Sequence, residues 1–182
     1  MLAIFIRWKK VDTNISLISE KWPSTSTMSK PDWRNPIHLI AAGFGSGLAP
    51  RAPGTFGTLA ALIPWWPLHF LPAMEYWAII AIGFALGIYV CGKTARDLRT
   101  HDHGAIVWDE FIGVWIALAW LPASAAWIVS GFLLFRLFDI WKPWPIRWCD
   151  KHVHGGFGIM LDDILAGAAA LAVLQASHWL LI

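Results

Sequence analysis

Two uncharged stretches decide the fold: residues 76–92, YWAIIAIGFALGIYVCG, and residues 164–182, ILAGAAALAVLQASHWLLI. They are 17 and 19 residues long, and neither contains Asp, Glu, Lys or Arg. A bilayer hydrocarbon core of about 30 Å is crossed by about 20 helical residues. Both stretches therefore predict helices that are just long enough to span a membrane.

A third apolar tract, residues 111–135, is interrupted at Leu121-Pro122. Because proline disfavours the continuation of a helix, we expect two helices here, over residues 105–121 and 123–141. A single unbroken helix would also place the basic segments on its two sides on opposite faces of a membrane, which argues against it.

Two more tracts precede these, a weak one at residues 38–48 and a stronger one at 56–71. Two prolines fall in the stronger tract, and we expect residues 63–67 to break or tilt its helix. Together the tracts predict an all-α, polytopic helical membrane protein with about four to five membrane-associated helices.

Composition supports this class. Of the 182 residues, 57% are hydrophobic and 14% are charged, against about 25% charged in an ordinary soluble domain. A net charge of +2 and two cysteines exclude a disulfide scaffold and disfavour a nucleic-acid-binding domain. The alternative is a very apolar soluble helical core, which the 14 tryptophans would fill.

The basic residues are sorted along the chain. All fourteen fall in residues 1–56, 93–104 and 136–163, and the turns at 67–75 and 121–126 contain none. The positive-inside rule places these three segments on the cytoplasmic side of a multi-pass membrane protein. Tryptophans near predicted helix ends are typical of an interfacial belt. These are Trp65, Trp66, Trp77, Trp120, Trp127, Trp141, Trp144 and Trp179.

Residues 1–33 differ from the rest of the chain. A short apolar start precedes three basic residues and a polar stretch at 23–28, which is the reverse of the order in a signal peptide. We therefore predict a polar leader over 1–33 and a membrane domain over 34–182, with Met28 as an alternative start.

Eight of the twelve acidic residues fall between Asp97 and Asp163, and five of them lie at the polar ends of predicted helices. These five are Asp109, Glu110, Asp139, Asp162 and Asp163. Carboxylates at a membrane boundary are costly unless they are solvated, paired or bound to a cation. If the clusters converge, a hard divalent ion such as Mg²⁺ would relieve their repulsion. The alternative is that Asp162 caps the last helix and that Asp109 and Asp139 pair with neighbouring cations.

A glycine-rich segment, GFGSGLAPRAPGTFGT at residues 43–58, contains five Gly and two Pro. Its backbone amides and the following helix N-terminus could bind an anion, with Arg51, Thr55 and Thr58 as further donors. It is not a Walker loop. The glycines alone could instead indicate a tight turn or close helix packing.

Arg136, Asp139 and Lys142 recur every three residues and predict one helical face before Pro143. Two cations that bracket an acid suit a phosphate beside a metal-binding carboxylate, and a structural ion pair is the alternative. Short histidine pairs at 101–103 and 152–154 lack the usual spacing of a zinc site. Cys91 with Arg96 is one residue short of a cysteine-phosphatase loop.

Four stretches carry a resemblance to a known family: GFGSGLAPRAPGTFGTLAAL at 43–62, HDHGAIVWDEFIG at 101–113, FRLFDIWKPWPIRW at 135–148 and VHGGFGIMLDDILAG at 153–167. In this order they resemble phosphatidylglycerophosphatase A. The resemblance implies an all-α, Mg²⁺-dependent lipid phosphatase of the bacterial inner membrane. Such an enzyme hydrolyses the terminal phosphate of phosphatidylglycerophosphate to give phosphatidylglycerol, so the implied partner is a phospholipid substrate within the bilayer.

On this basis we expect the metal ligands among Asp109, Glu110, Asp139, Asp162 and Asp163. We expect catalytic roles for Asp109, Glu110, Asp139 and Asp163. We expect Arg51, Thr55, Thr58, Arg136 and Lys142 to bind the substrate phosphate. The rival classes are a small membrane transporter or scaffold and a transferase that acts on a lipid-linked phosphate.

Overall fold

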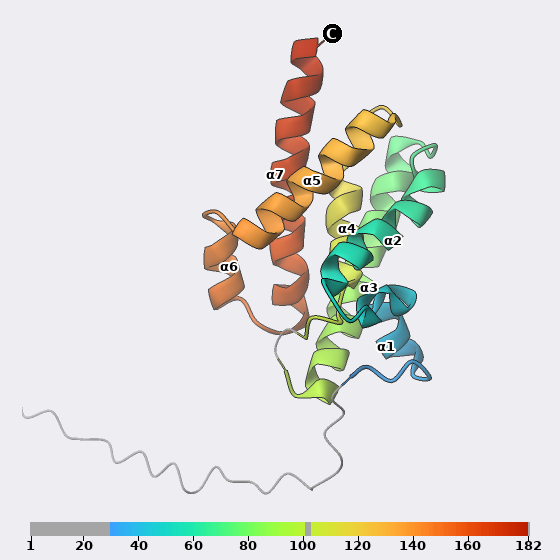
Figure 1. The fold of residues 1–182 in the computed structure, drawn as a ribbon, viewed down its shortest axis with the longest axis vertical. Coiled ribbons are helices and arrows are strands. Elements are labelled where there is room, and N and C mark those ends of the chain that lie inside the picture. Colours follow the sequence, from blue (N-terminus) through green and yellow to red (C-terminus); the bar gives the residue numbers. More distant parts are fainter. Residues whose placement is uncertain (1–29, 101–102, 182) are drawn as a thin grey trace, which may run out of the picture.

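The computed structural model describes residues 30–100 and 103–181. The described part of the chain is helical and contains no strand (Figure 1), which confirms the all-α prediction. In chain order the elements are α1 (Pro36–Ala41), the 3₁₀ segment η2 (Gly43–Leu48), α2 (Pro53–Leu68), α3 (Ala73–Leu98), α4 (Trp108–Ala117), α5 (Ala125–Trp141), α6 (Ile146–His152) and α7 (Gly155–Leu181).

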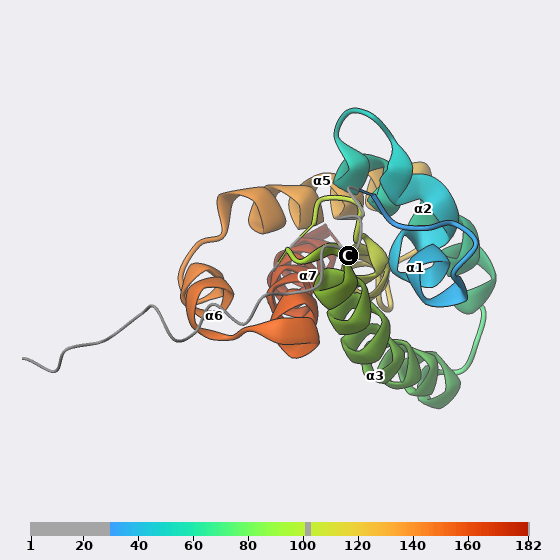
Figure 2. The same cartoon turned by 90° about the horizontal axis from the view of Figure 1, so that it is seen from below.

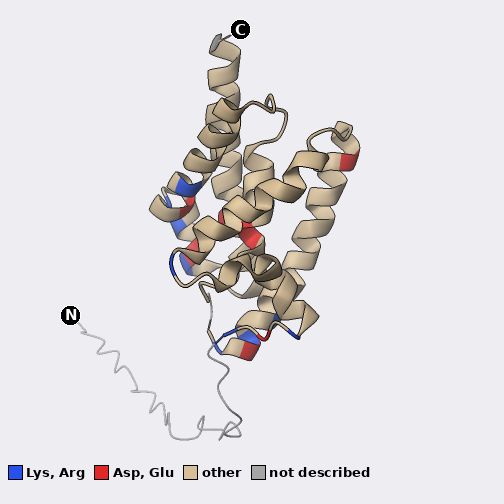
Figure 3. Ribbon diagram, turned by 45° about the vertical axis from the view of Figure 1, so that its right-hand side comes forward, with Lys and Arg blue, Asp and Glu red and all other residues tan. Residues whose placement is uncertain are grey.

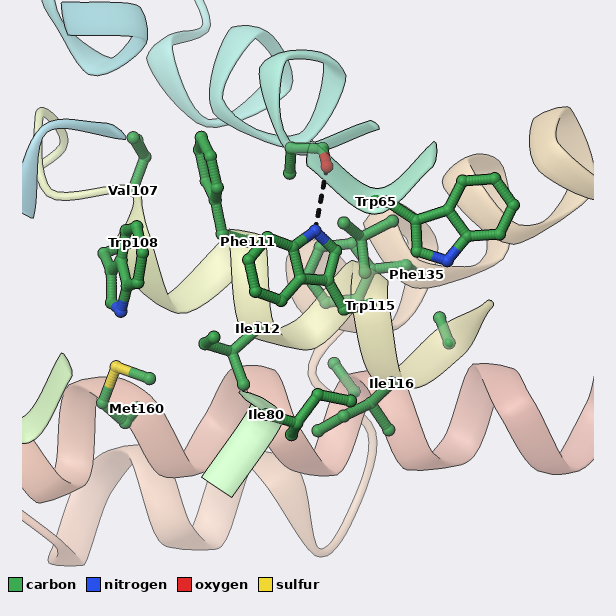
Figure 4. Close-up of a cluster of buried hydrophobic side chains, with 14 of the residues drawn as sticks. Trp65, Ile80, Val107, Trp108, Phe111, Ile112, Trp115, Ile116, Phe135 and Met160 are labelled. Carbon is green, nitrogen blue, oxygen red and sulfur yellow. Dashed lines mark hydrogen bonds between the residues drawn. The ribbon is translucent and has the colours of Figure 1, made fainter. Parts of the chain in front are cut away.

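The short helix α4 forms the centre of the fold. Every residue from Trp108 to Ala117 is buried, and α2, α3, α5 and α7 all pack against it. Its aromatic side chains lie between α2 and α7 (Figure 4), and the indole nitrogen of Trp115 donates to the carbonyl oxygen of Ala61 at 2.9 Å. A helix that is apolar on all sides is stable only when it is surrounded, and here protein surrounds it.

Two helices are long and apolar enough to cross a membrane, namely α3 and α7. This is fewer than the predicted four to five membrane-associated helices. The tract at 111–135 is divided near Pro122 as expected, but its first half forms the ten-residue α4, which is a core helix. The helices α2 and α5 have 16 and 17 residues. Apolar sequence alone therefore overestimated the number of spans, because it does not separate contact with lipid from contact with other helices.

Two predicted helix limits are wrong. The helix α2 continues through Pro64 and Pro67 to Leu68 and does not break at residues 63–67. The last helix begins at Gly155 instead of residue 164. Asp162 and Asp163 therefore lie inside α7, so the alternative in which Asp162 caps this helix is excluded.

The long helices approach one another at glycines. A Cβ at Gly167 of α7 would lie 2.3 Å from the carbonyl oxygen of Gly113 in α4. A Cβ at Gly156 would lie 1.9 Å from the carbonyl oxygen of Ile88 in α3. Seen along the bundle, α7 lies between α6 on one side and α1 and α2 on the other (Figure 2). Small residues at helix crossings are typical of packing between membrane helices.

Most charged residues lie away from the C-terminal end of α7 (Figure 3). Glu75 is an exception, because it lies in the first turn of α3, at the opposite end of that helix from its basic residues. Trp120, Trp141, Trp144 and Trp179 are exposed near helix ends, and their place in an interfacial belt stays a prediction. Trp65 is 1% exposed and belongs to the core. The predicted leader lies outside the described residues up to position 29.

We predict that Gly167→Leu destabilises the protein by about 1–3 kcal/mol or more, because the added side chain meets the backbone of α4. The measurement is the thermal unfolding midpoint of the purified protein in detergent. The matched control is Ala168→Leu, at the adjacent exposed position, which should unfold near the wild-type temperature. Equal midpoints for both variants would contradict the close α4–α7 crossing.

Candidate active site

The first turn of α4 brings two acids into the interior. Asp109 and Glu110 are 9% and 8% exposed. The segment that leads into this helix is held by the Val107 amide, which donates to the Ala41 carbonyl at 2.9 Å. Carboxylates in a first helical turn are favoured by the helix dipole, which partly offsets the cost of burying them.

Glu110 is held by two other elements. The Thr58 hydroxyl of α2 donates to Glu110 Oε2 at 2.9 Å, and Arg136 Nη1 of α5 lies 3.2 Å from Glu110 Oε1. Arg136 Nη1 also donates to Asp139 Oδ2 at 2.6 Å. Burial raises the pKa of Glu110 to about 7, against the opposing effects of Arg136 and Thr58. The arginine thus bridges the acids of α4 and α5.

Lys142 ends α5 in a left-handed conformation and carries the second cation of the cluster. Its ammonium group donates to Asp150 Oδ1 of α6 at 2.6 Å and to Asp162 Oδ2 of α7 at 2.5 Å. Burial alone would lower the pKa of Lys142, but these two hydrogen bonds outweigh it and hold the pKa above its ordinary value. Lys142 therefore connects three helices.

Asp163 is the most deeply buried acid of the group. It is 3% exposed, and its Oδ2 has no hydrogen-bond partner among the described residues. Its carboxylate is close enough to Asp139, Asp109, Asp162 and Glu110 to interact electrostatically with each of them. A Cβ at Gly113 would lie 2.9 Å from the Asp163 carbonyl oxygen, so this acid sits where α7 crosses α4.

Within the described residues, the ion pairs of this cluster join four carboxylates to two cations, Arg136 and Lys142. Buried carboxylate oxygens are the donors that Mg²⁺ prefers, so the donor chemistry and the unpartnered Asp163 oxygen fit such an ion. As the side chains stand, no three Asp, Glu, His or Cys residues within 30–100 and 103–181 form a ready metal-binding group.

The glycine-rich segment serves mainly close packing. A Cβ at Gly47 would lie 2.3 Å from the Ala105 carbonyl oxygen, and one at Gly54 would lie 2.1 Å from Glu110 Oε1. The N-terminus of α2 therefore borders the acid cluster. Arg51 is exposed, and within the described chain the side chains of Arg51 and Thr55 make no hydrogen bond or ion pair.

The structure brings together the five predicted acids with Thr58, Arg136 and Lys142. Arg51 and Thr55 lie at the edge of this cluster. The expected ion pair between Arg136 and Asp139 is present, but Lys142 turns away toward Asp150 and Asp162. Sequence reasoning missed Asp150, because nothing in the sequence distinguishes it from the neighbouring charged residues, and it missed the role of Gly54. The catalytic and metal-binding roles of the predicted residues stay predictions.

Comparison with known proteins shows the family of the chain. The family model described as phosphatidylglycerophosphatase A matches residues 39–178, which include every residue of the cluster. No solved structure matches the chain.

Three curated relatives cover most of the chain. Phosphatidylglycerophosphatase A of Escherichia coli is 53% identical over 80% of this chain and 86% of its own length. The Haemophilus influenzae protein of the same name is 52% identical over 81% of this chain and 92% of its own. A putative phosphatidylinositol-3-phosphatase of Bacteroides thetaiotaomicron is 37% identical over 79% and 94%. The chain therefore belongs to the phosphatidylglycerophosphatase A family of lipid phosphatases.

Proposed function

We propose that this protein hydrolyses the terminal phosphomonoester of phosphatidylglycerophosphate, with Mg²⁺, to give phosphatidylglycerol and inorganic phosphate. The observation that carries the proposal is the burial of four carboxylates where α4 and α7 cross, with Asp163 Oδ2 lacking a hydrogen-bond partner among the described residues. These four are Asp109, Glu110, Asp162 and Asp163. The names of the two relatives that share more than half of the aligned residues identify the substrate.

The proposed metal ligands are drawn from Asp109, Glu110, Asp139, Asp162 and Asp163. Asp163 is the strongest candidate, because its Oδ2 lacks a hydrogen-bond donor among the described residues. When bound, Mg²⁺ supplies positive charge that polarises the phosphate and lowers the pKa of bound water. The carboxylates of this chain would hold the ion in position and would receive the proton that the attacking water loses.

Positive groups at the edge of the cluster would bind the phosphate. Arg136 and Lys142 stabilise the equatorial oxygens, as preorganised cations do at a reacting phosphoryl group. The first-turn amides of α2, beginning at Gly54, add donors at a helix N-terminus. Water oxygen forms a bond to phosphorus, the bond from phosphorus to the lipid oxygen breaks, and that oxygen takes up a proton.

The proposed location is the cytoplasmic face of the bacterial inner membrane. The Lys and Arg residues of the described chain lie at the lower end and at mid-height of the molecule in Figure 3, away from the C-terminal end of α7. This distribution favours a cytoplasmic face by the positive-inside rule. The lipid tails can then stay in the bilayer while the headgroup reaches the carboxylates.

The direct test is phosphate release by the purified protein in mixed micelles of phosphatidylglycerophosphate. We expect release with Mg²⁺, loss of release with EDTA and recovery on adding Mg²⁺ back. Phosphatidylinositol 3-phosphate is the comparison substrate, because one relative carries that name. Release that needs a second acceptor would indicate a transferase, and no release would support a transporter or scaffold.

We predict that Asp163→Asn lowers kcat by about 100-fold or more, the scale of removing a key electrostatic group. The unfolding temperature should not fall, because the amide removes a buried charge that four carboxylates repel. The matched control is Glu75→Gln, an exposed acid at the opposite end of α3, which should keep wild-type turnover. Turnover of Asp163→Asn near the wild-type rate would contradict the assignment.

We predict that Arg136→Gln destabilises the protein by about 3 kcal/mol, because it leaves the buried Glu110 and the half-buried Asp139 without their shared cation. Adding Glu110→Gln should restore part of the unfolding free energy, which a double-mutant cycle would measure as a coupling between the two positions. Phosphate release should stay low in both variants. Additive stability changes would show that the ion pair contributes no coupling.

A further inference from the structure

A groove beside the acid cluster is lined by aromatic and basic side chains. It has a volume of about 480 Å³ and lies between the end of α5 and α6. Its walls include Trp141, Lys142, Trp144, Arg147, Trp148 and Lys151. The described residues that line it include three cations from Lys and Arg and no carboxylate. The groove therefore favours an anionic group attached to an apolar body.

The side chains of α6 divide into two faces. Ile146 is 2% exposed and anchors the helix, whereas Arg147, Trp148, Lys151 and His152 are exposed. Trp148 and His152 stack with their ring centroids 4.8 Å apart. Exposed tryptophan together with basic side chains is the composition of segments that lie at the interface of a membrane with anionic lipids.

The groove and the acid cluster share a residue. Lys142 lines the groove and donates to Asp162 Oδ2. The same ammonium group pairs with Asp150 of α6, so the position of α6 relative to α7 is fixed by this ion pair. An anion in the groove would consequently lie directly beside the proposed reaction site.

We propose that this groove binds the phosphodiester and glycerol backbone of the lipid substrate, and of the product that keeps them. This inference rests on the proposed function. The proposed substrate carries two phosphates separated by one glycerol, and only the terminal one is hydrolysed. With the phosphodiester held by Arg147 and Lys151, and the tails beside the exposed indoles, the terminal phosphate reaches Lys142 and the carboxylates.

This placement would separate recognition from chemistry. Arg147 and Lys151 recognise the part of the lipid that does not react, so they act as positioning residues. Such residues raise catalytic efficiency by orienting the reacting group. Their loss should increase KM by more than it lowers kcat.

The test measures binding of dioleoylphosphatidylglycerol to the purified full chain in detergent by native mass spectrometry. Phosphatidylglycerol carries the phosphodiester and glycerol but has no phosphate to release, so binding is independent of turnover. The wild type should retain it over dioleoylglycerol, which has the same tails and glycerol backbone but no phosphodiester. The double variant Arg147→Gln/Lys151→Gln should weaken binding about tenfold, the scale of lost charge-assisted hydrogen bonds to phosphate.

Two controls match these variants. Arg34→Gln removes an exposed cation that does not line the groove. This variant should bind phosphatidylglycerol as the wild type does. Trp144→Ala should weaken binding, whereas Trp179→Ala, which removes an equally exposed indole (80% against 83%) at the other end of the molecule, should not. Correct folding is checked by an unchanged unfolding temperature in every variant.

Three results would overturn the proposal. The first is equal binding by the groove variants and the wild type. The second is full competition by inorganic phosphate, which would make the groove a general anion site. The third is weaker binding in Arg96→Gln alone, because Arg96 lines a different pocket where α3 meets Gly155. If phosphatidylglycerol binds in the groove but phosphatidylglycerophosphate releases no phosphate, the proposed function is contradicted and the groove is still a lipid-binding site.

Discussion

The carboxylate of Asp163 is buried at the point where α7 crosses α4 and interacts electrostatically with four other acids. The ion pairs around it offset part of this repulsion between like charges. Arg136 spans Glu110 and Asp139, and Lys142 spans Asp150 and Asp162. Each cation therefore joins acids from different helices. Because removing one partner of a buried pair leaves an uncompensated charge, the same contacts that assemble the site also fix α4, α5, α6 and α7 relative to one another.

The glycines make this arrangement sterically feasible. Gly113 and Gly167 let the backbones of α4 and α7 approach closely, and Gly54 leaves room for the Glu110 carboxylate beside α2. A side chain at any of these positions would separate the elements that carry the charges. Close helix contact and the convergence of carboxylates are therefore two results of the same small residues.

Several features could be predicted because they depend on local chemistry. The apolar tracts predicted helices, and Pro122 correctly predicted the division between α4 and α5. The spacing of Arg136 and Asp139 predicted an ion pair that the structure contains. Other features depend on tertiary contacts that no local pattern records. The sequence predicts that Trp65 lies at the membrane interface and that α4 contacts lipid, but both are enclosed by protein. Asp150 joins the site only because α6 folds back onto α7. The helix α2 continues through Pro64 and ends one residue after Pro67.

The balance of charge also bears on how the proposed reaction would begin. Both cations of the cluster are already engaged with carboxylates, so a phosphate that arrives alone would add negative charge to an acidic, largely buried site. Low local polarity strengthens that repulsion. A divalent cation reverses the sign of the interaction, since it compensates both the carboxylates and the incoming phosphate. If the proposed function holds, metal and substrate should therefore each increase the affinity for the other, because such coupling between two ligands is reciprocal. On the proposed function, the site would become competent when metal and lipid phosphate are present together.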